Sequence, residues 1–123
     1  MQKTSTNVLS MVLNDNYDDV IDTSISFTMK GGWSFSVDAM CDTGASMNSI
    51  DGALFKKLAK NTTEYVREVS VVSSLGKQVR EVYRIDFEIE GLTISDEFNI
   101  ADRSGRRTPV LLGMSTLMYD EEE

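Results

Sequence analysis

A strict alternation of apolar and polar residues begins at Ile21 and continues to Lys30. Alternation with a period of two is typical of a strand that buries one face, so this stretch predicts such a strand. Gly31 and Gly32 follow, and they predict a two-residue hairpin turn because glycine adopts positive φ without steric cost. A second strand is predicted directly after the turn. Its inward residues are expected to be Trp33, Phe35, Val37, Ala39 and Cys41.

The next segments predict a short helix and then more strands. Ser49 or Asp51 is expected to cap a helix that runs through about Lys60. Leu54 and Leu58 would stack on one face of this helix. β-Branched and aromatic residues favour extended chain in several later segments. These segments are residues 64–73, 83–90, 92–100 and 110–112.

Three irregular features are expected among these later strands. Residues 74–77 predict a turn, and a bulge is expected near Asp96 and Glu97. A final helical turn is expected over residues 114–118.

The length of 123 residues suffices for one compact domain with one core. We expect residues 1–19 to form a loose N-terminal arm, residues 20–118 to form a single β domain, and residues 119–123 to form a solvated acidic tail. Many short strands and glycine turns predict a mostly β protein. A small closed barrel or a sandwich is expected, because closure removes exposed strand edges.

Composition excludes several classes of partner. The net charge of −8 argues against nucleic acid, which needs a basic face to displace counterions from phosphate. No segment approaches the roughly 20 apolar residues of a membrane span. The single cysteine, Cys41, cannot form a disulfide within the chain, so we expect a reducing, cytoplasmic protein.

The chain contains no histidine, and this excludes several kinds of active site. Ser-His-Asp and Cys-His catalysis both need an imidazole, and so does a zinc site built from His and Cys. Carboxylates, Lys, Tyr and the lone thiol remain as acids or bases. Cys41 falls in register with the inner face of its strand, so we expect it to be a small core residue.

The candidate chemistry lies directly after the second strand, in Asp42-Thr43-Gly44-Ala45. The small residues allow the backbone to fold tightly beneath the carboxylate, and the Thr43 hydroxyl could form a hydrogen bond across an interface. From these residues alone two interpretations stay open. Asp42 either begins an ordinary turn or is displayed for chemistry.

The order of these parts resembles the retropepsin-like aspartic proteases. Asp42-Thr43-Gly44-Ala45 closes a hairpin, a flap-like hairpin follows, and the apolar segment ending in Leu112-Gly113 returns later. The family includes retroviral and retrotransposon proteases, and also a bacterial and phage branch labelled "ATP-dependent zinc protease". The resemblance implies a small closed β-barrel of the retropepsin type with one or two short helices.

The resemblance also implies a mechanism and a set of site residues. Asp42 would be the catalytic acid, supported by Thr43, Gly44 and Ala45. Because one chain carries one Asp-Thr-Gly motif, the second carboxylate would come from a homodimer partner. No metal or cofactor is implied, and the substrate would be a peptide or protein, cut in limited processing of a specific, viral or phage, precursor. The substrate-binding flap would consist of Ser73, Ser74, Leu75, Gly76 and Lys77.

Two alternatives remain beside the peptidase. Met114 stands where retroviral proteases carry an arginine, so the ion pair that supports the family's loop is expected to be missing. A retropepsin-fold module that binds partners without catalysis would fit this departure. A purely structural β protein, with Asp42 in a plain turn, is the third hypothesis.

Overall fold

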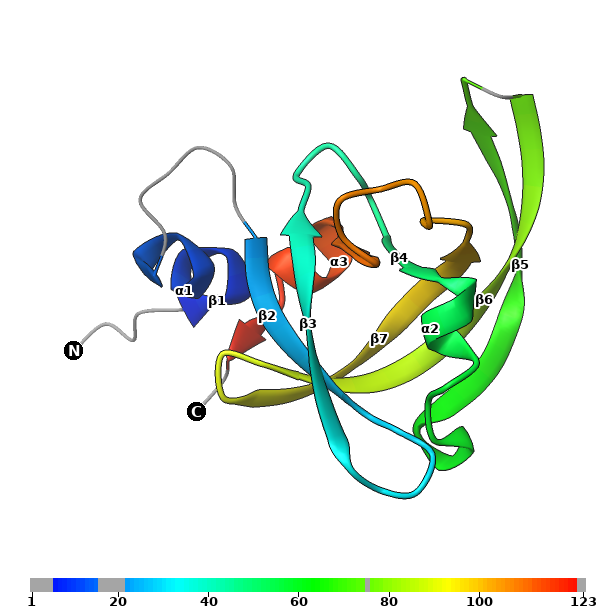
Figure 1. Ribbon diagram of the computed structural model, residues 1–123. Coiled ribbons are helices and arrows are strands. Elements are labelled where there is room, and N and C mark those ends of the chain that lie inside the picture. The colour runs from blue at the N-terminus through cyan, green and yellow to red at the C-terminus, as the bar shows by residue number, and fades with distance from the viewer. Residues whose placement is uncertain (1–5, 16–21, 75, 122–123) are drawn as a thin grey trace.

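Nine strands and three short α-helices make up the computed structural model, which describes residues 6–15, 22–74 and 76–121 (Figure 1). The helices are α1 (Val8–Asp15), α2 (Gly52–Phe55) and α3 (Met114–Leu117), with a 3₁₀ turn at Lys60–Thr62. The strands are β1 (Thr6–Asn7), β2 (Asp22–Thr28), β3 (Ser34–Cys41), β4 (Asn48–Asp51), β5 (Thr63–Ser73), β6 (Gly76–Ile89), β7 (Leu92–Ala101), β8 (Val110–Leu112) and β9 (Asp120–Glu121).

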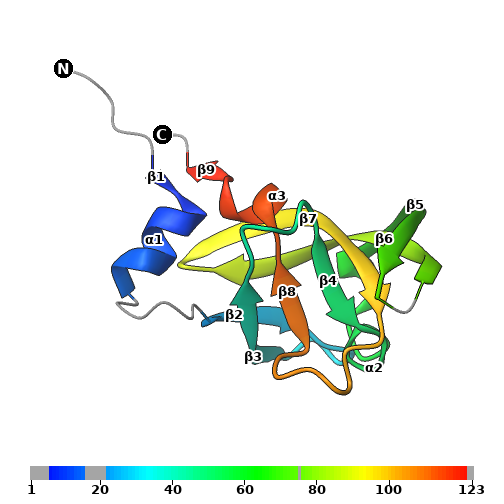
Figure 2. The ribbon, with the colours of Figure 1, turned by 90° about the horizontal axis from the view of Figure 1, so that it is seen from above.

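Six strands close into a barrel in the order β2-β3-β8-β4-β7-β6, and β6 pairs back onto β2. The closing contact pairs Ile25 with Ile89 and Ser26 with Glu88. β8 lies between β3 and β4, as Figure 2 shows. The prediction of a mostly β, closed barrel of the retropepsin type is confirmed, although three short α-helices are present in the described residues where one or two were expected.

Alternating residues of β2 and β6 fill the barrel. Ile25 and Phe27 of β2 are buried, as are Ile85, Phe87 and Ile89 of β6. Acidic residues between them on β6 face the solvent. Three phenylalanines, Phe27, Phe87 and Phe98, meet in the centre with ring centroids 5.3–6.1 Å apart. The period-two pattern therefore predicted the buried face of these strands correctly.

The predicted inner face of β3 is wrong at its first two residues. Ala39 is fully buried, but Trp33 is 55% exposed and Phe35 is 39% exposed. The reason is the short length of β8, which pairs with β3 only from Ala39 to Cys41. Side chains before Ala39 therefore lack the neighbouring strand that would cover them.

Two other predictions differ in position. The helix after Asp51 ends at Phe55 instead of about Lys60, although Asp51 caps it as predicted. The expected bulge near residues 96–97 is absent from the β6–β7 pairing, which runs in continuous register there. A register shift lies instead in β5, between Tyr65 and Arg67.

Part of the predicted N-terminal arm packs on the barrel. Val8 and Val12 of α1 have no exposed surface and belong to the core cluster. Next to this helix, β1 pairs with β9, so Asp120 and Glu121 of the expected tail form a short strand. Three parts of these predictions lie outside the described residues: 1–5 and 16–19 of the arm, 20–21 of the domain, and 122–123 of the tail. The sequence of residues 8–15 has only a weak helical pattern, so the packing of this helix on the barrel was not predicted.

We expect Val12→Ala to lower the free energy of unfolding by about 2 kcal/mol, because it removes two buried carbon atoms and leaves a small cavity. Leu13→Ala, at a neighbouring position that is 44% exposed, is the matched control and should change it by less than about 0.5 kcal/mol. Urea unfolding curves measure both values. Equal effects of the two variants would show that α1 does not contribute to the core in solution.

Candidate active site

The loop from Asp42 to Met47 joins β3 to β4 and passes next to α3 (Figures 1 and 2). The Asp42 N–H donates to the carbonyl of Leu112 at 2.9 Å, which continues the β3–β8 pairing into the loop. Thr43 and Gly44 are exposed, whereas Asp42 is half-buried. The loop therefore presents its tip to the surface while its base is fixed by β8.

The Asp42 carboxylate is held by the backbone of its own loop. The Gly44 N–H donates to Asp42 Oδ1 at 2.8 Å, and the Ala45 N–H donates to the Asp42 carbonyl at 3.1 Å. Within the described residues, Oδ2 accepts no hydrogen bond. A Cβ on Gly44 would lie 3.1 Å from Oδ1 and would press on the carboxylate. One oxygen is thus oriented by the loop, and the other has no partner among the described residues.

A second segment, residues 112–115, packs against the loop and forms hydrogen bonds with it. The Met114 N–H donates to the Ala45 carbonyl at 2.8 Å, and the Ser115 N–H donates to the Ser46 carbonyl at 3.2 Å. Gly113 allows this approach, because a Cβ there would lie 2.6 Å from the Met47 carbonyl oxygen and 2.8 Å from the Ala45 carbonyl oxygen. Both contacts are with backbone atoms, so any side chain at residue 113 would push the two segments apart.

Asn48 joins these segments through a buried polar network that the sequence analysis missed. Asn48 is fully buried, and its Oδ1 accepts from the Gly113 N–H at 2.9 Å. Its Nδ2 donates to Thr116 Oγ1 at 2.7 Å and to Asp96 Oδ2 at 3.3 Å. The Thr116 hydroxyl in turn donates to Asp96 Oδ2 at 2.6 Å. A neutral amide therefore supports the loop where Met114 replaces the arginine of retroviral proteases.

The loop borders a cavity of about 680 Å³. Gly44, Ala45, Ser46 and Met47 form one side, and β5 forms another through Val69 to Val72. The loop between β7 and β8 closes a third side and contributes Arg103 and Arg106, and Arg80 of β6 joins them. The structure thus brings the Asp-Thr-Gly loop, the β5–β6 hairpin and a basic loop around one space.

The residues predicted as a flap lie at the tip of the β5–β6 hairpin, which projects beyond the barrel (Figure 1). Ser74, Gly76 and Lys77 are exposed, Ser73 ends β5, and Leu75 lies outside the described residues. The cavity is lined by the stem of the hairpin and not by these tip residues. Asp42 and Thr43 also lie outside the lining: Asp42 is half-buried at the base of its loop, and Thr43 is on the exposed tip.

Cys41, directly before Asp42, is not a nucleophile at neutral pH. Burial raises the pKa of its thiol to about 11, and the negative charges of Asp22 and Glu90 act in the same direction. The thiol therefore stays protonated, as the role of a small core residue requires.

Among residues 6–15, 22–74 and 76–121, no group of three or more Cys, Asp or Glu side chains is placed to hold a metal ion. No helix in these segments has the length and apolar character to cross a bilayer.

Solved structures of known proteins share this fold. The fold is similar to the solution structure of the simian foamy virus (mac) protease, with a TM-score of 0.53, 17% identity, and coverage of 77% of this chain and 89% of that one. It is also similar to the foamy viral protease-reverse transcriptase in complex with RNA/DNA hybrid, with a TM-score of 0.55 and 16% identity. That match covers 85% of this chain and 12% of the larger protein.

A protein of unknown function from Legionella pneumophila has a similar fold as well, with a TM-score of 0.50, 14% identity, and coverage of 77% of this chain and 81% of that one. Among curated proteins, none matches the sequence. The family model described as aspartyl protease matches residues 25–116, which is more than half of the chain. The chain therefore belongs to this aspartyl protease family.

We expect Asn48→Asp to lower the free energy of unfolding by about 2–4 kcal/mol at pH 7, because it removes a buried donor and places a second carboxylate beside Asp96. The loss should shrink as the pH falls, since the two carboxyl groups can then share a proton. Urea unfolding at pH 7 and at about pH 4 measures both effects. Asn61→Asp, at an exposed position, is the control, and an equal response of the two variants would rule out the network as a support.

Proposed function

We propose that this protein is one subunit of a homodimeric aspartic endopeptidase. The observation that carries the proposal is the Asp42 carboxylate, with one oxygen oriented by the Gly44 N–H and the other without a partner in the described residues. The next residues of the same loop, from Gly44 to Met47, line a cavity. The bracing of the loop against Gly113 supports it, because a catalytic group must be held in a fixed geometry. Membership of the aspartyl protease family supports it as well.

The mechanism uses two carboxylates, one from each subunit. Two acids at hydrogen-bonding distance cannot both ionise at low cost, so they share one proton. The ionised Asp42 takes a proton from water, which attacks the peptide carbonyl carbon. The neutral partner Asp42 gives its proton to the carbonyl oxygen, which yields a tetrahedral gem-diol. The proton taken from water is then passed to the peptide nitrogen, the C–N bond breaks, and the amine and the carboxylic acid leave while the pair again holds one proton. The titration of the two Asp42 carboxyl groups belongs to the pair and not to either residue.

The exposed tip of the loop suits a role at the dimer axis. Thr43 and Gly44 are the exposed residues of the motif, and a twofold partner would present the same pair in return. The Thr43 hydroxyl then has a backbone or hydroxyl group of the partner within reach. The tip of the β5–β6 hairpin, from Ser73 to Lys77, would cover the substrate and exclude water.

The charge of the cavity indicates an acidic substrate. Arg80, Arg103 and Arg106 all line it, and the guanidinium of Arg106 has no hydrogen-bond or ion-pair partner in the described residues. Burial, followed by repulsion from Arg106, lowers the pKa of Arg103. The lining carboxylate, Asp102, is turned onto the hydroxyl and N–H of Ser104. A glutamate or aspartate side chain near the scissile bond would relieve this repulsion.

This selectivity fits limited processing of a specific protein better than bulk digestion, since a cleft that demands a charged side chain accepts few sequences. A non-catalytic binding module of the same fold is the competing function, and it would use the cavity without hydrolysis.

We expect Asp42→Asn to abolish peptide hydrolysis, with a loss of at least about 10³-fold in kcat/KM, because an amide can neither hold nor accept the shared proton. The measurement is cleavage of a diverse peptide pool across pH, with sedimentation equilibrium on the same samples. The wild type should sediment as a dimer. A monomeric wild type without activity would favour the binding module.

We expect Arg106→Glu to lower kcat/KM about tenfold for peptides with an acidic residue beside the scissile bond, and to raise it for matched basic peptides. Arg107→Glu is the control, because Arg107 lies outside the cavity lining and pairs with Asp22. Competition assays with paired acidic and basic peptides measure the ratio. An unchanged ratio in Arg106→Glu would contradict the assignment of the basic cavity to substrate recognition.

A further inference from the structure

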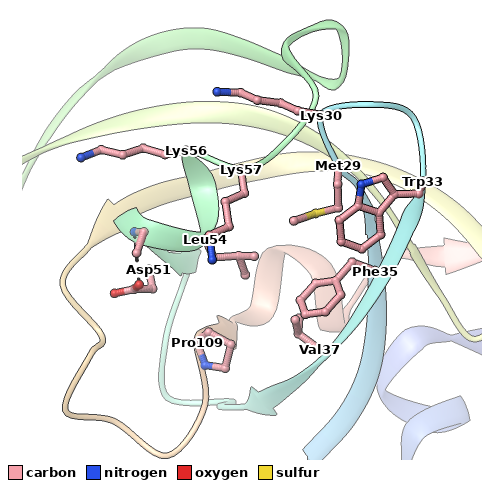
Figure 3. Close-up of a pocket in the computed structure, with 11 residues that line it drawn as sticks. Met29, Lys30, Trp33, Phe35, Val37, Asp51, Leu54, Lys56, Lys57 and Pro109 are labelled. Carbon is pink, nitrogen blue, oxygen red and sulfur yellow. Dashed lines mark hydrogen bonds between the residues drawn. The ribbon is translucent and has the colours of Figure 1, made fainter.

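A second cavity of about 770 Å³ lies between the start of β3 and α2 (Figure 3). Figure 3 shows the rings of Trp33 and Phe35 on one side, with Leu54 and Pro109 on the other. Among the described residues, none lines both this cavity and the one bordered by Gly44 to Met47. The second cavity is therefore a separate site, which we call the aromatic pocket.

The wall of the aromatic pocket is apolar and open to solvent. Trp33, directly before β3, and Phe35 of β3 are both exposed, and their rings pack edge to face with centroids 5.7 Å apart. Met29, Val37 and Leu54 continue the apolar wall. Aromatic side chains are enriched at interfaces, because each ring buries a large apolar area on contact with a partner.

The edge of β3 beside the aromatic pocket is open. β8 pairs with Ala39 to Cys41, and within the described residues no strand pairs with this edge of β3 from Ser34 to Asp38. Pro109, directly before β8, lines the pocket at the point where that pairing begins. The pocket therefore occupies the space that a longer β8 would fill. An extended segment fits this space, because it can add main-chain hydrogen bonds along β3.

The charged residues around the aromatic pocket are mostly basic. Lys30, Lys56 and Lys57 line it, are exposed, and form no ion pair within the described residues. The carboxylate that lines it, Asp51, is engaged by the Ala53 N–H at 3.2 Å and by the Arg103 N–H at 2.7 Å. Three unpaired lysines on a chain with a net charge of −8 form a local basic rim around an apolar wall.

We propose that the aromatic pocket is a docking site for an extended segment of a partner protein, in which bulky apolar side chains are flanked by acidic residues. The apolar side chains cover Trp33 and Phe35, and the flanking carboxylates pair with the lysine rim. The site does not depend on hydrolysis at Asp42. In a peptidase, such a site would hold a substrate at a distance from its scissile bond.

Trp33 is the single tryptophan of the chain, so its fluorescence reports directly on the pocket. The experiment titrates full-length Asp42→Asn protein, which prevents cleavage, with a ten-residue synthetic peptide. The peptide carries a central leucine-phenylalanine pair between runs of glutamate. We expect a saturable blue shift of the emission and an affinity that falls with added salt. Two matched peptides replace the glutamates by lysines or the apolar pair by serines, and each should bind at least about tenfold more weakly.

The double variant Lys56→Glu, Lys57→Glu should weaken binding of the acidic peptide about tenfold, because both side chains are on the exposed surface of the pocket rim. Lys60→Glu, an exposed lysine outside the lining, is the control and should not change it. Far-ultraviolet circular dichroism checks that the variants are folded.

Several results would overturn the proposal: no saturable signal with the acidic peptide, equal binding of the lysine-flanked peptide, or no effect of the double variant. A signal from a short single-stranded oligonucleotide but not from the peptide would assign the pocket to nucleic acid instead. Binding by the Asp42→Asn protein keeps this result separate from the proposed peptidase activity. Either can fail while the other holds.

Discussion

The close contact between Gly113 and the Asp42 loop is the constraint on which the site depends. Two backbone segments, far apart in the sequence, approach until the space for a single Cβ is gone. This proximity allows Met114 and Ser115 to donate to the carbonyls of Ala45 and Ser46. The barrel contributes to the same contact, because β8 is held between β3 and β4 and delivers Gly113 beneath the loop. The carboxylate geometry therefore follows from barrel closure and from the missing side chain at one residue.

The buried amide of Asn48 makes this contact specific. An apolar residue could fill the same volume, but it would leave the Gly113 N–H and the Thr116 hydroxyl with fewer partners in a buried site. The network also ties the loop to Asp96 on β7, on a different part of the barrel wall. A neutral group achieves this without the desolvation cost of an ion pair, so the methionine at residue 114 does not leave the loop without support.

The sequence predicted correctly the features that depend on a local pattern. It did not predict the features that depend on pairing between distant segments of the chain. The alternation in β2 and β6, the Asp51 cap and the apolar segment before Gly113 are all visible in short windows. The exposure of Trp33 depends on the length of β8, which lies far along the chain. The burial of Val8 depends on the barrel it covers, and the Asn48 network depends on three elements that meet only after folding. The Asp-Thr-Gly motif identified the loop at Asp42 as the candidate site. The cavity beside this loop and its basic lining could not be predicted, because they depend on where the loop at residues 102–108 lies in the fold.

The single extra residue in β5, at Val66, lies where the long hairpin leaves the barrel. Its neighbour Arg67 pairs with Val82, and Val82 pairs with Asn99 near the end of β7, so the hairpin continues beyond this point as two strands. A bulge increases the local twist and interrupts the ladder on one side. We therefore expect bending of the hairpin stem toward the cavity to be concentrated at Val66, where the ladder is interrupted, rather than shared along the 14 residues of β6.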